Sequence, residues 1–411
     1  MQTASISLPQ QKTFSGWWVV AGAFAVMFMG FGAAYAFGSF FHSLRDEFGA
    51  TRREISLVFS LTALLYFSLG ALSGSLADRF GPRRIIAVGG LLVGLGLLLA
   101  ATTHSLWQVY ITYSLGVGLG VGAAYVPAVG AVQRWFIRQR GLASGLAVSG
   151  IGLGTLIMPP VAAALIAWVG WRWTYTLLGI AALFIMIPAA GLIERSPEDR
   201  GLTPDGDPPI ANKSPAATAE ATPGEALRSS TFWWLYFAMV TTSLGLFIPF
   251  VHIVPYATDH GISEFAAAFI LGAIGAGSTL GRLALGGTAD RLGRRQGLAA
   301  ALLLMAAMQL WWLMSVNLWS LLVFAFCFGT GYGGFVALIP ALTADYFGVR
   351  QAGAIIGLLY TGIGIGSFLG PILAGVAFDL SYSYTLPILL SAGANLVAVC
   401  CIIALGRIHR T

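Results

Sequence analysis

The sequence contains little charge: Asp, Glu, Lys and Arg together make up 9% of its 411 residues. Soluble domains carry about 25% charged residues, so this composition excludes an ordinary soluble protein. Only two lysines are present, Lys12 and Lys213, and neither follows a glycine. A phosphate-binding P-loop is therefore excluded, and with it ATP hydrolysis by this chain. The net charge of +6 comes without a basic patch interleaved with aromatic residues, so we expect no nucleic-acid partner.

The groups that usually build a catalytic or metal centre are also scarce. The three cysteines lie in apolar stretches and suggest no disulfide framework, and the five histidines lack the spacing of metal ligands. Gly329-x-Gly331-x-x-Gly334 matches a dinucleotide fingerprint, but no strand precedes it. We therefore expect neither an enzyme nor a cofactor or metal.

Apolar stretches of about 20 residues, each long enough to cross a bilayer as a helix, recur along the whole chain. They predict an all-α membrane protein with twelve transmembrane helices, at 17–42, 55–77, 84–103, 106–135, 139–168, 173–193, 232–258, 264–288, 296–315, 318–346, 351–378 and 383–406.

The two parts of the chain repeat each other at a fixed offset. Asp78 in Gly-Ser-Leu-Ala-Asp-Arg-Phe-Gly returns as Asp290 in Gly-Gly-Thr-Ala-Asp-Arg-Leu-Gly, 290 − 78 = 212 positions later, and Pro159 returns as Pro371. A duplicated set of six helices indicates two pseudo-symmetric bundles with a polar site between them. We predict bundles at 1–193 and 231–411, joined by a polar linker at 194–230.

The basic residues predict the orientation. Of the 22 Lys and Arg residues, only Arg45, Arg52, Arg53 and Arg172 fall outside if both ends of the chain are cytoplasmic, and Arg282 falls within a helix. Cytoplasmic loops carry the excess of positive charge, so we expect a multi-pass protein of the inner (plasma) membrane with both termini inside.

The doubled loop predicts a gate at the cytoplasmic side. A carboxylate that ends a helix there can cap a neighbouring helix and pair with arginine. By symmetry we expect Asp78 and Asp290 to face the starts of the eleventh and fifth helices and to hold that side shut in one state. The other members of this motif are Arg79, Arg83, Arg291 and, at the fourth-to-fifth helix junction, Arg138.

This doubled loop resembles the signature of the major facilitator superfamily over the whole chain. The opening Gly16-Trp17-Trp18-Val-Val and the junction from Trp135 to Gly150 resemble the monocarboxylate transporter family, including bacterial lactate transporters related to the animal carriers. The resemblance implies symport of a proton with a small monocarboxylate such as L-lactate or pyruvate, by alternating access.

Arg282 is the candidate substrate-binding residue. It lies about 12 Å along its helix from the cytoplasmic loop, and a lone guanidinium there costs about 3 kcal/mol unless it finds a partner. No membrane-embedded acid is predicted, so a carboxylate ligand is the natural partner for its planar donor fork. The family also places a substrate-binding arginine in the eighth helix. The alternative is an arginine whose side chain extends to the membrane interface.

The proton route cannot be copied from the animal carriers, because their Asp four residues before this arginine and their Lys in the first helix are Ser278 and Tyr35 here. Either the carboxylate and proton neutralise the site together, or a histidine titrates. His252, in the outer half of the seventh helix, is the candidate, and His42 occupies a similar place in the first.

Aromatic residues in helices that should face the axis complete the candidate site, because phenols can bind a hydroxyl and rings can enclose a short carbon chain. These are Tyr35, Tyr125, Tyr332, Phe335 and Tyr360.

Two other functions remain open. An organic anion exchanger of the oxalate–formate type would favour a second cation in the cavity, and only Arg282 is found. A membrane sensor would be expected to add a signalling domain. The bilayer is the expected environment, and we expect the chain to function as a monomer.

Overall fold

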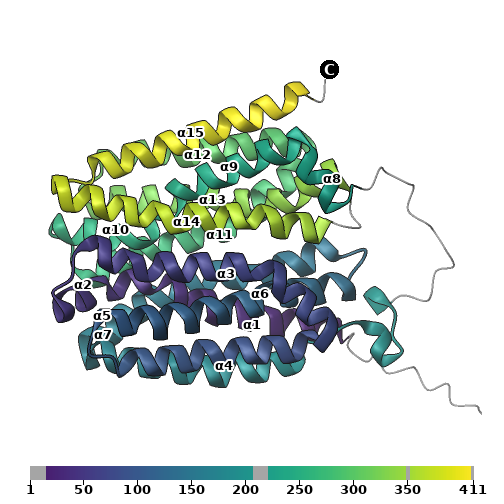
Figure 1. Cartoon of the computed structure of the whole chain (residues 1–411), viewed down its shortest axis with the longest axis horizontal. Helices are drawn as coiled ribbons and strands as arrows, with labels where there is room; N and C mark the ends of the chain where they lie inside the picture. Colours follow the sequence, from purple (N-terminus) through teal and green to yellow (C-terminus); the bar gives the residue numbers. More distant parts are fainter. Residues whose placement is uncertain (1–14, 207–220, 349–351, 409–411) are drawn as a thin grey trace, which may run out of the picture.

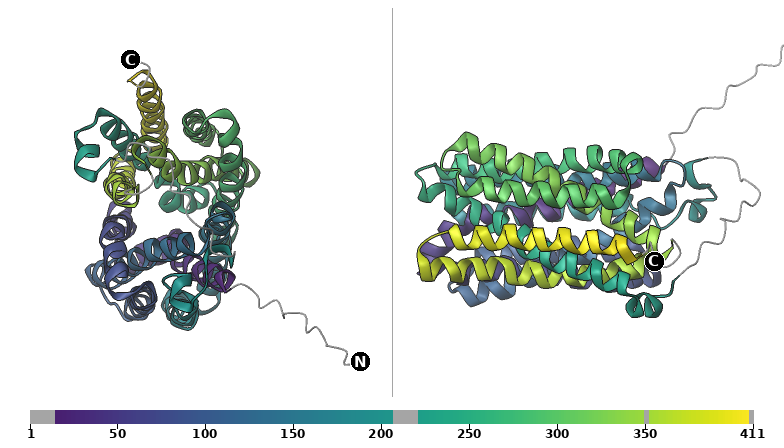
Figure 2. Two further views of the ribbon diagram at one scale, coloured as in Figure 1. Left: turned by 90° about the vertical axis from the view of Figure 1, so that its right-hand side faces the viewer. Right: turned by 90° about the horizontal axis from the view of Figure 1, so that it is seen from above.

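The computed structural model describes residues 15–206, 221–348 and 352–408, and within these ranges the chain forms helices and no strands. Long helices lie side by side in one bundle (Figure 1). Viewed along the helices, those of the N-terminal half (residues 15–206) and those of the C-terminal half (residues 221–408) form two groups that face each other (Figure 2, left). The all-α membrane fold predicted from the sequence is confirmed.

The N-terminal half begins with α1 (Gly16–Tyr35) and α2 (Phe37–Phe48), which together form the first span. The remaining helices of this half are α3 (Arg52–Phe80), α4 (Pro82–Ala101), α5 (Leu106–Val109), η1 (Tyr110–Leu115), α6 (Gly116–Trp135), α7 (Arg140–Leu192), η2 (Pro197–Arg200) and η3 (Pro204–Gly206). The C-terminal half contains α8 (Pro223–Arg228), α9 (Ser230–Leu246), α10 (Ile248–Asp259), α11 (Glu264–Leu292), α12 (Arg294–Leu313), α13 (Leu318–Phe347), α14 (Ala352–Ser381) and α15 (Thr385–Ile408).

Eleven helical segments of the described chain are long and apolar enough to cross a membrane. The longest, Gly141–Leu192, corresponds to two of the predicted spans, because Gly170 has φ 82° and breaks the helical path. Gly154 and Ala189, on either side of this break, both contact α1, so α7 turns back on itself. A left-handed φ favours glycine, which has no Cβ to clash with the backbone.

The first span of each half is broken at an equivalent place, which the sequence analysis did not anticipate. α1 passes into α2 after Tyr35, and α9 passes into α10 at Phe247, which is 247 − 35 = 212 positions later. Pro249 lies in the first turn of α10, where the missing N–H of proline is tolerated. Its ring prevents α9 and α10 from forming one uninterrupted helix. The two breaks bring Tyr35 and Phe247 to the centre of the molecule.

The described part of the chain begins and ends at one end of the bundle, and the described parts of the segment that joins the halves lie at that end too (Figure 1). We call this the terminal end and the opposite one the far end. The halves contact each other through α3 with α14, α2 with α10, and α7 with α11. Gly275 on α11 and Gly152 on α7 make this approach possible, because a Cβ on Gly275 would lie 2.4 Å from the Gly152 carbonyl oxygen. Small residues of this kind let membrane helices pack closely.

The described residues at the two ends of the predicted linker (194–230) are bonded to the bundle. Asp205 accepts hydrogen bonds from the backbone N–H groups of Ile137 (2.9 Å) and Arg138 (2.7 Å) in the loop between α6 and α7. The backbone N–H of Ala221 donates to the carbonyl of Phe347. Both ends of this segment are therefore attached to the terminal end, one to each half.

Candidate functional site

Arg282 lies inside the bundle, on the part of α11 that crosses the membrane. Only 8% of the residue is exposed, and its Nη1 donates to the backbone carbonyl of Val148 on α7, in the other half, at 3.1 Å. Its Nε and Nη2 atoms are buried without a hydrogen-bond partner. Unpaired buried donors of a charged group are costly, and a negatively charged group is the partner that would satisfy them.

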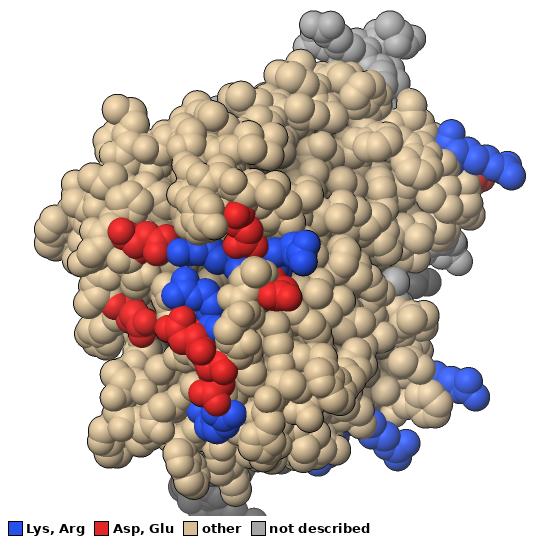
Figure 3. Space-filling view, turned by 60° about the vertical axis from the view of Figure 1, so that its left-hand side comes forward, with Lys and Arg blue, Asp and Glu red and all other residues tan. Residues whose placement is uncertain are grey.

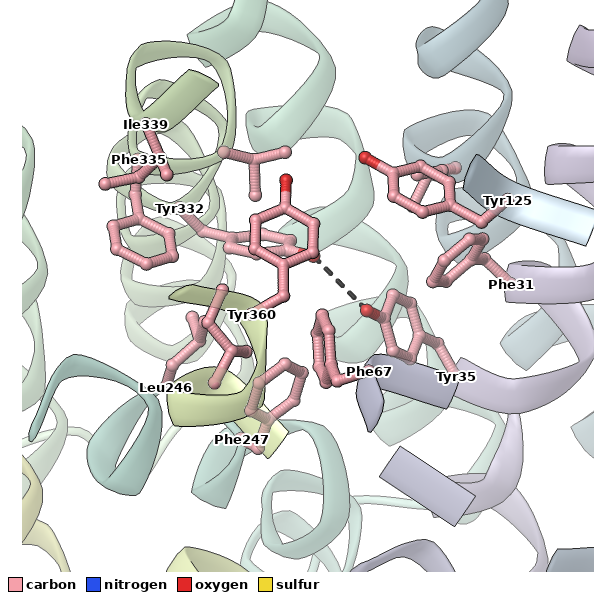
Figure 4. Close-up of a pocket in the computed structure, with 13 residues that line it drawn as sticks. Phe31, Tyr35, Phe67, Tyr125, Leu246, Phe247, Tyr332, Phe335, Ile339 and Tyr360 are labelled. Carbon is pink, nitrogen blue, oxygen red and sulfur yellow. Dashed lines mark hydrogen bonds between the residues drawn. The ribbon is translucent and has the colours of Figure 1, made fainter. Parts of the chain in front are cut away.

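A small cavity lies beside it, at the interface of the two halves (Figure 4). Its volume of about 30 Å³ is enough for about two water molecules. The thirteen residues that line it are Phe31, Tyr35, Phe67, Tyr125, Ile151, Leu246, Phe247, Tyr332, Phe335, Val336, Ile339, Tyr360 and Ile363. This wall contains phenols and apolar side chains, and no charged group.

All five aromatic residues selected from the sequence line this cavity, and the guanidinium carbon of Arg282 is 5.9 Å from the centre of the Tyr332 ring. The hydroxyls of Tyr35 and Tyr332 are 3.3 Å apart and join the two halves by a hydrogen bond (Figure 4). Sequence reasoning missed Phe31, Phe67 and Phe247. The repeat itself could have found Phe247, since it is the counterpart of Tyr35.

A larger cavity of about 430 Å³, which we call the vestibule, extends from this site toward the terminal end. It is lined by residues of both halves, including Asp78 and Pro82 from one half and Gly353 from the other. At the far end, side-chain contacts join the two halves across their interface. The site is therefore open toward the terminal end and closed toward the far end.

The closure at the far end includes a polar cluster that we call the far-end clasp: Arg52 and Ser56 on α3, and His252, Asp259, Phe378, Asp379 and Tyr384 of the other half. Nη2 of Arg52 donates to both carboxylate oxygens of Asp259, at 2.9 and 2.7 Å. Its Nη1 donates to the Tyr384 hydroxyl, and its guanidinium stacks 3.9 Å from the centre of the Phe378 ring.

Acidic and basic side chains gather on this end of the molecule (Figure 3). Sequence reasoning treated Arg52 only as one of four basic residues on the outer side. It could not identify the residue as an inter-half contact, because its partners lie 207 and 332 positions away.

His252 belongs to this clasp and does not line the central cavity. It is fully buried, and its Nε2 lies 3.0 Å from the Pro371 carbonyl and 3.1 Å from the Ser56 hydroxyl. Its Nδ1 lies 3.3 Å from the Tyr384 hydroxyl. A carbonyl only accepts, so the bond to Pro371 assigns the proton to Nε2, and Nδ1 accepts from Tyr384. His42 also joins the halves, with its Nε2 2.7 Å from the Thr258 hydroxyl.

The residues of the doubled loop lie at the terminal end. The Asp78 carboxylate pairs with Arg134 of α6, within the same half. The start of the eleventh helix near Gln351, which is its predicted neighbour, lies outside the described residues. The Arg79 guanidinium lies 5.2 Å from the centre of the Phe80 ring, and Arg83 is exposed. Arg138 is exposed at the start of the loop that Asp205 caps.

The corresponding side chains of the second half, Asp290 and Arg291, lie outside the described residues. The gate predicted from both copies of the loop therefore stays a prediction.

The family comparisons agree with this architecture. The model of the Major Facilitator Superfamily matches residues 22–292 and 233–410. Human monocarboxylate transporter 11 is 30% identical over 409 residues, which cover 95% of this chain and 83% of the relative. Human monocarboxylate transporter 2 is 29% identical, with 95% and 86% covered, and bovine monocarboxylate transporter 13 is 30% identical, with 93% and 87% covered.

A solved structure with the same fold is the bacterial homologue of the human lysosomal transporter Spinster, in an inward-facing and unoccupied conformation. It superposes with a TM-score of 0.75 at 16% identity, over 96% of this chain and 98% of the other.

A helical membrane bundle of two repeated halves around a central cavity defines a membrane transporter, and this chain belongs to the Major Facilitator Superfamily. Within that superfamily it is a member of the monocarboxylate transporter family, as its relatives place it. It is a multi-pass membrane protein and not an enzyme.

Proposed function

We propose that this protein carries a small monocarboxylate, such as L-lactate or pyruvate, together with a proton across the inner membrane by alternating access. The observation that supports this most directly is the pair of buried, unpaired donor atoms on Arg282 beside a cavity without any other charge. One cation balances one carboxylate, and a second carboxylate would enter an apolar wall uncompensated. The names of the relatives point to the same substrate class.

The positive-inside rule orients the terminal end toward the cytoplasm, so the described state is open to the inside. The two six-helix bundles, at 1–193 and 231–411, would then rock about the central site. Each chain contains a complete cavity at the interface of its own halves, which favours function as a monomer.

The proton has two possible carriers. It can enter with the carboxylate, so that the pair neutralises the site, or it can bind His252 in the far-end clasp. The second route is supported by the hydrogen bond that Nδ1 of His252 accepts from the Tyr384 hydroxyl. A proton on Nδ1 would oppose that bond and place a positive charge in the same cluster as Arg52, which would weaken the closed clasp.

Uptake of labelled lactate into liposomes with an imposed pH gradient tests the proposal. Wild-type protein should accumulate lactate when the outside is acidified, and Arg282→Ala or Arg282→Lys should abolish accumulation while the protein stays folded. Arg172→Ala, which removes a partly exposed arginine paired with Glu47 within one half, is the matched control and should transport normally. Normal uptake by both Arg282 variants would refute the proposed site.

The same vesicles separate the alternatives. Accumulation that depends strictly on an internal anion, without proton movement, would indicate exchange of the oxalate–formate type. A membrane sensor would accumulate nothing. His252→Ala should change the pH profile of uptake, and an unchanged profile would assign the proton to the substrate.

A further inference from the structure

We propose that the start of α1 and the end of α7 bind the headgroup of an anionic phospholipid, of the phosphatidylglycerol type, in a cavity at the terminal end. We call this space the headgroup cavity. The inference goes beyond the proposed function, because it concerns the outer surface of the N-terminal half and does not depend on which solute the protein carries.

The headgroup cavity is separate from the central site. Its volume is about 290 Å³, compared with about 30 Å³ for the central cavity, and none of its lining residues lines the central cavity or the vestibule. The walls come from the start of α1, the last turn of α7 and the segment that follows it. They include Ser15, Trp18, Gly191, Leu192, Glu194 and Arg200.

The position of this cavity along the helices matches the headgroup level of a bilayer. The apolar spans that border it are Gly16–Phe48 and Gly141–Leu192. Ser15 directly precedes the first span, and Glu194 and Arg200 follow the second. The cavity therefore lies where two spans end together, at the boundary between the hydrocarbon core and the polar headgroups.

The two tryptophans at the start of α1 have different surroundings. The ring of Trp17 lies 4.9 Å from the ring of Phe136, between their centres, whereas Trp18 is 60% exposed and lines the cavity. Leu192 of α7 also lines it and is 41% exposed. Tryptophan favours the membrane interface because its ring is apolar and its N–H is polar. Trp18 and Leu192 thus offer an apolar rim for the first part of an acyl chain.

The charges around the cavity leave one guanidinium without an acidic partner. Glu194 and Arg200, which both line it, form an ion pair with each other. Arg83, at the start of α4, approaches from behind Gly191, where an added Cβ would lie 3.6 Å from its Nη2 atom. Arg83 is exposed and pairs with no acid among the described residues. Gly191 has no side chain that would separate this guanidinium from the cavity.

A phosphodiester with one negative charge fits this balance. It neutralises the guanidinium of Arg83, whose planar fork can donate to two phosphate oxygens at once. Ser15 makes no side-chain bond that caps α1, so the start of this helix adds partial positive charge. A glycerol headgroup also has hydroxyls that can donate to the Glu194 carboxylate.

A zwitterionic headgroup fits less well. It brings no net charge and would leave one guanidinium uncompensated at the edge of the apolar region. The bound anionic lipid would join the ends of α1, α4 and α7, so it should stabilise the N-terminal half as a ligand stabilises any folded state that it prefers.

Lipid binding can be measured on the purified, delipidated full chain by native mass spectrometry, with thermal unfolding as a second readout. The probes are phosphatidylglycerol, phosphatidylethanolamine and phosphatidylcholine with identical acyl chains. Phosphatidylglycerol should bind most tightly and raise the unfolding midpoint. Glycerol phosphate, the soluble headgroup, should not raise it, because it lacks the chains that Trp18 and Leu192 would contact.

Two substitutions that break the same ion pair should have opposite effects. Arg200→Gln removes a positive charge and should weaken phosphatidylglycerol binding by about fivefold, as expected for one cation near an anionic membrane surface. Glu194→Gln removes the negative charge and should strengthen the binding. A merely structural role of the pair would change both variants in the same direction.

Arg83→Gln should weaken phosphatidylglycerol binding by about fivefold too. The matched control is Arg228→Gln, which removes an exposed arginine of α8 at the terminal end of the other half. It should bind as the wild type does. Equal weakening in Arg83→Gln and Arg228→Gln, weaker binding in both variants of the ion pair, or equal affinity for phosphatidylethanolamine would overturn the inference.

A further variant tests the cavity itself. Gly191→Leu places a side chain in front of the Arg83 guanidinium, and the first atom of that side chain meets only an ordinary contact, so the protein should fold and lose the preferred lipid. Residues 1–14 lie outside the described residues, and deletion of residues 2–13 should leave binding unchanged. Binding that appears only after this deletion would show that the N-terminal segment occupies the cavity and would refute the lipid assignment.

Discussion

Removal of the Arg52 side chain is the most direct test of the far-end clasp. Arg52 is the residue through which the N-terminal half reaches Asp259, Tyr384 and Phe378 of the other half. Arg52→Ala deletes these contacts at once. It should therefore weaken the conformation that is closed at the far end, relative to the one that is open there.

The size of this effect follows from the contacts. A hydrogen bond to a charged group contributes about 1.5–3 kcal/mol, and stacking of a cation on a ring adds about 1 kcal/mol. The Asp259 side chain is 34% exposed, so water replaces part of its lost interaction. We expect a net loss of about 2–4 kcal/mol from the closed form, which is a shift of roughly thirtyfold to several hundredfold in the equilibrium between the two conformations.

The assay is a distance measurement between spin labels at Thr102→Cys and Met314→Cys, two exposed far-end positions in opposite halves. Wild-type protein without substrate should give one short distance, and Arg52→Ala should add a population at a longer distance. Arg172→Ala is the control, because Arg172 bonds Glu47 and the Thr103 carbonyl within its own half. Identical distance distributions in Arg52→Ala and Arg172→Ala would refute the role of the clasp.

Three further predictions follow from the contacts. Gly275→Ala should also populate the open far end, because the added Cβ would lie 2.4 Å from the Gly152 carbonyl oxygen; Gly393→Ala, with no atom within 4 Å of its Cβ, should not. Gln309→Leu removes two buried hydrogen bonds, of 3.2 and 2.5 Å, that join α12 to α9 and α15. It should therefore lower the midpoint of thermal unfolding, with a loss of about 1–3 kcal/mol in the free energy of unfolding. An unchanged midpoint would contradict this. Burial opposes ionisation of Asp205, but three backbone N–H groups of the adjoining loop outweigh it and lower its pKa below the usual 3.8. The carboxylate therefore stabilises this loop at pH above about 4 and loses that effect as the pH falls through the lowered pKa. Asp205→Asn should speed amide exchange in the loop at pH 7, corrected for intrinsic rates, and match the wild type near pH 2; a pH-independent difference would exclude the charge as the cause.

The parts of the fold that depend on local pattern were predictable. Apolar runs of bilayer length indicate spanning helices because each backbone polar group must be satisfied inside its own segment. The fixed offset between Asp78 and Asp290 indicated a duplicated architecture. Arg282 stood out because an isolated cation in an apolar stretch is costly wherever the helix lies.

The tertiary structure alone decided which distant residues meet. Arg52, His252 and Tyr384 are scattered along the chain, and each by itself is compatible with an exposed or interfacial side chain. They form one clasp only because the two halves meet at the far end in this conformation. The same packing places His252 outside the cavity and pairs Asp78 with Arg134.

The physical reason is the range of the interactions involved. The hydrophobic length of a helix and the cost of burying a charge act on a single segment, so the order of residues determines them. Contacts between the halves depend on the relative position of two bundles, which changes with the conformational state. The sequence by itself therefore determined the class of protein and the position of Arg282 within a membrane span, whereas only the folded arrangement decided which side of the cavity is closed and by which residues.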